Sequence, residues 1–159
     1  MPGASLIPTQ AQFVNDLLAV NNAACERYRA IAARSRNAVL RYVLSDIARQ
    51  KCEAHRALER WAQPVTVLSM AATEWPRRVM RIYATCEQEF DDDATDRLAA
   101  RLLVAEQLLL SAVEDACRAG APDQLSRELG DALVHFRAIP SQLHALGRYN
   151  QHPSRTTRS

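Results

Sequence analysis

Four segments of the chain repeat apolar residues at spacings of three and four, which is the period of one face of a helix. They run from Phe13 to Ile31, from Leu40 to Trp61, from Ala99 to Cys117 and from Leu125 to Leu143. Only 4 of the 159 residues are glycine, and alanine, leucine, arginine and glutamate are abundant. This composition favours helix over sheet. The pattern therefore predicts a single all-α domain with one core.

The residues that flank the first two stripes predict where these helices begin and end. Thr9 with Gln12 has the spacing of a capping box, in which each side chain caps the other residue's backbone amide. Ser35 and Asn37 predict a tight turn followed by the N-cap of the second helix. The second helix should end near Ala62, ahead of a proline.

Similar signals predict the later helices. Residues 73–76 read as a helix start, and a short helix to about Glu89 would bury Val79, Ile82 and Cys86. The acids at 91–93 should cap the third long helix, which Gly120 ends.

Asp123 should cap the last long helix. Pro140 should bend or break this helix, because proline lacks the amide donor and clashes with the preceding turn. Gly147 is its expected end.

These elements predict an N-terminal coil over 1–8, a four-helix bundle over 9–148 and a mobile basic tail over 149–159. The link between the second and third long helices is longer than the other two and contains the short extra helix. A long crossover of this kind is typical of ferritin-like bundles. The fold class expected is therefore an all-α, ferritin-like four-helix bundle.

One charged residue interrupts the apolar stripe of the third long helix. Glu106 lies among leucines, and a carboxylate inside a bundle core is unfavourable unless a metal or a cation neutralises it. Lys51 is the only lysine, and on a helical wheel it falls within the stripe of the second helix. Two readings stay open: Lys51 pairs with Glu106, or it extends to the surface. Arg137 is an alternative cation.

In several of these residues the chain resembles a small bacterial, rubrerythrin-related ferritin-like family of unknown function. The resemblance rests on Asn-Asp-Leu-Leu at 15–18, on Tyr28, and on the run that Glu106 opens in the third long helix. It covers roughly residues 12–146. Metal-binding members of that superfamily use glutamates together with Glu-x-x-His pairs, so the resemblance raises the question of a di-iron site.

The chain departs from that ligand pattern. Asn21 stands seven residues before Tyr28, where rubrerythrins carry a ligand glutamate, and no Glu-x-x-His occurs in the sequence. We therefore expect no metal and no cofactor, and a buried polar group of Glu106, Lys51 and Asn21. The alternative is an atypical site for iron or another transition metal around Glu106 and His55.

The remaining reactive residues point to no other chemistry. Cys25, Cys52, Cys86 and Cys117 form no C-x-x-C pair, so reduced thiols in a cytoplasmic protein are expected. Mixed charge with a net +2 suggests no nucleic-acid surface, and no stretch is apolar enough for a membrane span.

The sequence favours a non-catalytic structural or interaction protein over an enzyme. The apolar crossover around 65–75 should either form a homodimer interface or pack over the bundle's own end. A metal-binding or redox protein is the alternative function. The protein partner and the biological role are not encoded in any motif of the chain.

Overall fold

The computed structural model describes residues 6, 8–62 and 74–149. Within these residues the chain is helical and has no strand, which confirms the all-α prediction. The four long helices are α1 (Pro8–Arg34), α2 (Ala38–Leu58), α4 (Thr95–Arg118) and α5 (Asp123–Tyr149), and the shorter α3 (Glu74–Gln88) lies in the crossover. Two short 3-10 turns, η1 (Glu59–Trp61) and η3 (Asp92–Ala94), extend α2 and precede α4.

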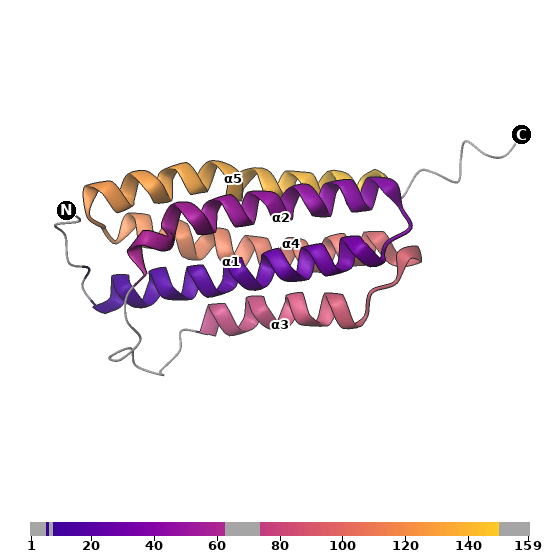
Figure 1. The fold of residues 1–159 in the computed structure, drawn as a ribbon, viewed down its shortest axis with the longest axis horizontal. Coiled ribbons are helices and arrows are strands. Elements are labelled where there is room, and N and C mark those ends of the chain that lie inside the picture. The colour runs from indigo at the N-terminus through magenta and orange to yellow at the C-terminus, as the bar shows by residue number, and fades with distance from the viewer. Residues whose placement is uncertain (1–5, 7, 63–73, 150–159) are drawn as a thin grey trace, which may run out of the picture.

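The helices lie roughly side by side in one bundle (Figure 1). α1 packs against α2 as a hairpin, and α4 packs against α5 as a second hairpin. α2 contacts α5 on one side of the bundle, whereas α3 contacts both α1 and α4 on the other. The short crossover helix α3 therefore packs as part of the bundle and joins the two hairpins by contacting one helix of each.

Apolar residues from all five helices form one core. Fully buried examples are Leu17 of α1, Ile47 of α2, Val79 of α3, Leu102 of α4 and Phe136 of α5. The bundle therefore has the single core that the chain length predicts.

The inward face of α4 is rotated slightly from the predicted stripe. Leu98, Ala105 and Leu109 are buried, whereas Leu103 and Leu110 are half-buried. Glu106 keeps its predicted central place on this face.

The caps predicted for the first two helices have different outcomes. Asn37 caps α2 as predicted, since its Oδ1 accepts from the backbone amides of Val39 and Leu40 at 3.0 and 3.2 Å. The predicted capping box is wrong: α1 already begins at Pro8, and the Gln12 amide donates to Asp16. The Gln12 side chain therefore bonds one turn ahead, to Asp16, instead of back toward Thr9.

The acids at 91–93 do more than cap. Asp91 caps the 3-10 turn η3, since its Oδ1 accepts from the Asp93 amide at 2.9 Å, whereas α4 begins after Ala94 without a side-chain cap, so the predicted cap of the third long helix is wrong. Asp92 instead accepts from Ser35 Oγ at 2.6 Å and from the Arg36 amide at 2.7 Å. This carboxylate therefore ties the α3–α4 turn to the α1–α2 turn, and these two bonds lower its pKa.

The predicted break at Pro140 is wrong, because α5 is helical on both sides of this residue and continues past the predicted end at Gly147 to Tyr149. Proline removes one backbone hydrogen bond there. Phe136, Ile139 and Leu143 on the same face are all buried. Their burial holds the helix in place despite the lost bond.

Two predicted segments fall largely outside the described residues. The tail at 150–159 and the crossover at 63–73 are not described. Of the apolar crossover only the end is seen, where Trp75 packs on the Phe13 ring with centroids 6.0 Å apart. That contact supports packing on the bundle itself at this residue.

Candidate functional site

A buried cluster of polar side chains surrounds Glu106 at the centre of the bundle. The Glu106 carboxylate is 2% exposed, and Lys51 is fully buried. The Lys51 ammonium contacts Glu106 Oε1 as a hydrogen-bonded ion pair. Of the two readings of Lys51 left open by the sequence, the ion pair with Glu106 is therefore the one present, and extension to the surface is not.

Two tyrosines complete the cluster, and neither was assigned a role from the sequence. Tyr28 of α1 and Tyr83 of α3 each donate a phenol hydrogen bond to Glu106 Oε2, at 2.7 and 2.6 Å. Their rings meet edge to face with centroids 5.7 Å apart. Four helices thus each send one side chain to the same point.

The fifth helix contributes an aromatic face. The Lys51 Nζ lies 5.0 Å from the centroid of the Phe136 ring of α5, which is cation–π geometry. The ammonium is therefore held between a carboxylate oxygen and a ring, with no water-exposed side. These two contacts partly replace the hydration that the Lys51 ammonium loses on burial.

Burial controls the proton affinities in the cluster. It lowers the pKa of Lys51 because the ammonium loses its hydration, while the Glu106 charge opposes this effect. Burial raises the pKa of Tyr28 and of Tyr83 well above the usual value, and the neighbouring carboxylate raises both further. The two phenols are therefore firmly protonated donors.

The donor chemistry around Glu106 does not fit a metal ion. A ferritin-like centre needs several carboxylate oxygens and imidazole nitrogens with free lone pairs. Here Glu106 contacts an ammonium and two phenol hydroxyls, all of which donate hydrogen bonds to it. Over residues 8–62 and 74–149 no three His, Cys, Asp or Glu side chains lie close enough together to hold a metal.

The other predicted site residues lie apart from this contact. Asn21 is fully buried, but its amide makes no hydrogen bond to any described residue, so it is not bonded into the Glu106 cluster. His55 is half-buried, and its Nδ1 lies 3.2 Å from the Leu18 carbonyl oxygen. Arg137 is exposed and does not serve as the cation.

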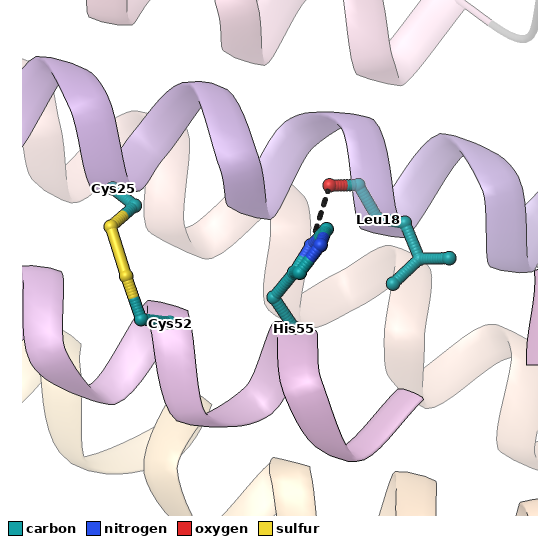
Figure 2. Close-up of a disulfide and its surroundings, with 4 residues drawn as sticks. All are labelled: Leu18, Cys25, Cys52 and His55. Carbon is teal, nitrogen blue, oxygen red and sulfur yellow. Dashed lines mark hydrogen bonds between the residues drawn. A yellow bond between two sulfur atoms is a disulfide. The ribbon is translucent and has the colours of Figure 1, made fainter. Parts of the chain in front are cut away.

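The cysteines differ from expectation. Cys25 of α1 and Cys52 of α2 form a disulfide, with Cα atoms 6.0 Å apart (Figure 2). The expectation of four reduced thiols is therefore wrong for this pair, whereas Cys86 and Cys117 are free. The antiparallel register of the α1–α2 hairpin brings the two positions together, and spacing along the chain gives no sign of it.

Comparison with known proteins adds no identification. The sequence matches no protein-family model and no curated protein, and no solved structure matches the fold. No helix within the described residues has the length and apolarity needed to cross a membrane.

Proposed function

We propose that the chain is a non-catalytic, ferritin-like bundle with a structural or interaction role, in which a protein cation replaces a metal. The observation that carries this proposal is the set of partners of Glu106. Lys51, Tyr28 and Tyr83 all donate to its two oxygens. The Lys51 ammonium balances the charge of the carboxylate, and the three donors together engage both of the oxygens to which a metal ion would bind.

The Glu106 carboxylate and the Lys51 ammonium are paired with each other and buried, so neither group is presented to a substrate. Lys51 could act as a base only after losing its proton, and it is fully buried. The cluster's clearest physical effect is to define how four helices align, because each partner must reach the same two oxygens. Buried polar groups of this kind specify register in some helical assemblies.

An iron oxidation assay tests the proposal. Purified protein would be mixed with ferrous iron in air, and the formation of ferric iron followed by absorbance. The matched control is the Glu106→Gln, Lys51→Met double variant, which lacks the charged pair. We expect equal rates for the two proteins, both at the level of buffer alone. Faster oxidation by the wild type than by the double variant would contradict the proposal.

An atypical metal or redox site around Glu106 and His55 was the alternative function. His55 Nδ1 is engaged with the Leu18 carbonyl, and the groups bonded to Glu106 come from Tyr28, Lys51 and Tyr83 instead. Within the described chain, His55 and Glu106 belong to no group of three potential metal ligands, so the geometry does not favour this alternative.

A homodimer and a cytoplasmic location stay proposals. The crossover that would form the interface lies outside the described residues apart from its end. Light scattering on the purified protein separates a monomer from a dimer. The Cys25–Cys52 disulfide bears on location, because stable disulfides are typical of oxidising compartments. A cytoplasmic protein requires this bond to be readily reducible.

A further inference from the structure

The Cys25–Cys52 disulfide spans the seam between α1 and α2 (Figure 2). Its two cysteines differ in their exposure to solvent. Cys25 is 5% exposed and belongs to the buried face of α1, whereas Cys52 is half-buried. A thiolate in solution can therefore approach the Cys52 side of the bond more readily than the Cys25 side.

We propose that this disulfide is a redox modification site, at which small thiols attack Cys52 and open the bond while the bundle stays folded. The proposal is independent of the structural role assigned to the Glu106 cluster. Its ligand class is a low-molecular-weight thiol or its disulfide.

The exchange balances in two steps. A small thiolate attacks Cys52 Sγ, forming a mixed disulfide and releasing Cys25 as a thiolate, which takes up a proton. A second thiolate then attacks the small-molecule sulfur of the mixed disulfide and releases Cys52 as a thiolate, which is also protonated. The protein disulfide gains two electrons, and two small thiols are oxidised to one small disulfide. The reverse sequence closes the bond.

Two features of the hairpin allow opening without unfolding. One turn beyond Cys52, His55 reaches across the same seam to the Leu18 carbonyl oxygen, so a second link remains (Figure 2). Fully buried apolar residues such as Leu17 and Ile47 also stay packed between the helices. The opened state therefore keeps the core that holds α1 against α2.

The site is also placed to affect the central cluster. Lys51 directly precedes Cys52 on α2, and Tyr28 lies one turn after Cys25 on α1. Both residues bond to Glu106. The disulfide thus fixes the alignment of α1 and α2 at the level where their side chains reach the carboxylate, and opening it releases that constraint.

The first test measures the redox state of the folded protein. A Cys86→Ala, Cys117→Ala background leaves only the pair, and the wild-type chain with peptide mapping serves if that background does not fold. Protein equilibrated in buffers of reduced and oxidised glutathione would be quenched by alkylation, with circular dichroism recorded in parallel. We expect full interconversion at unchanged helix content. Reduction only in denaturant, or two free thiols under fully oxidising conditions, would overturn the proposal.

The second test identifies the attacked sulfur. In the same background, Cys25→Ser leaves Cys52 alone and Cys52→Ser leaves Cys25 alone, which makes them matched variants. Oxidised glutathione should modify Cys52 about tenfold faster or more in the folded proteins, because accessibility controls thiol reactivity. The two rates should become similar in denaturant. Equal rates in the folded proteins, faster modification of Cys25, or a difference that persists in denaturant would overturn it.

Discussion

The coupling between Lys51 and Glu106 makes the sharpest prediction about stability. Removing one member of a buried pair leaves the other charge uncompensated, which typically costs about 3–5 kcal/mol. For Lys51→Met we expect the lower part of that range, because Tyr28 and Tyr83 still donate to the carboxylate.

For Glu106→Gln the expected loss in the free energy of unfolding has an upper bound. Lys51 can escape its isolation by losing its proton, and its pKa is already lowered by burial. Removing the proton from an ordinary lysine at pH 7 costs about 4.6 kcal/mol. The unpaired Lys51 charge should therefore lower the free energy of unfolding of the variant by no more than about this amount. Glutamine also keeps an oxygen that accepts from the tyrosines. Leucine at position 106 would be a poorer choice, since two buried phenol hydroxyls would lose their acceptor.

The double variant Glu106→Gln, Lys51→Met carries no unpaired charge. It should therefore be more stable than the sum of the single losses predicts, by about 2–3 kcal/mol. Urea unfolding at pH 7, followed by circular dichroism and extrapolated to zero denaturant, gives the free energies. Additive losses within error would refute the pairing.

An exposed pair provides the matched control for this cycle. Arg49 bonds to Glu53 one turn along α2 at 2.7 Å, with both side chains about half exposed. The same substitutions there, Arg49→Met and Glu53→Gln, should show a coupling within the error of the measurement, because solvent screens an exposed ion pair. A coupling as large as that of the buried pair would mean that the assay reports something other than burial.

Three other perturbations have directions set by the structure. Tyr28→Phe and Tyr83→Phe should each cost about 1.5–3 kcal/mol at pH 7, because each removes a bond to a charged acceptor. Both tyrosine pKa values are raised in the folded state, so the stability that the protonated phenols contribute is present below pH 10 and lost above it. The free energy of unfolding of each variant should therefore fall less steeply at alkaline pH than that of the wild type, and an unchanged pH profile would contradict this. Pro140→Ala should raise the free energy of unfolding by roughly 1–3 kcal/mol by restoring a backbone donor inside a continuous helix, and a loss of stability in urea would count against it. Reducing the Cys25–Cys52 bond, which joins residues 27 apart, should lower stability by about 3–4 kcal/mol, and an unchanged thermal midpoint under reducing conditions would be the opposing result.

Helical periodicity predicted more of the structure than any motif did. It indicated the all-α class, the four long helices and the inward positions of Lys51 and Glu106, because these depend only on residue spacing within one helix. The N-cap at Asn37 was found for the same local reason. Within α3, Tyr83 lies four residues after buried Val79, so the same spacing could have indicated that it faces inward.

Contacts between helices could not be read from the chain. The convergence of Tyr28 and Tyr83 on one oxygen depends on how α1, α3 and α4 align, and the Cys25–Cys52 bond depends on the register of the α1–α2 hairpin. Neither has a sequence signature, since each joins residues distant in the chain. The expectation of a break at Pro140 fails for a different reason, because it applies a local rule where tertiary packing outweighs the lost hydrogen bond.

Elemental analysis of the purified protein tests the central claim most directly. The claim is that Glu106 is neutralised by Lys51 and two tyrosine hydroxyls rather than by metal. Protein purified in air without chelators should contain well under one iron or manganese ion per chain. A reproducible pair of such ions per chain, lost on Glu106→Gln, would contradict it.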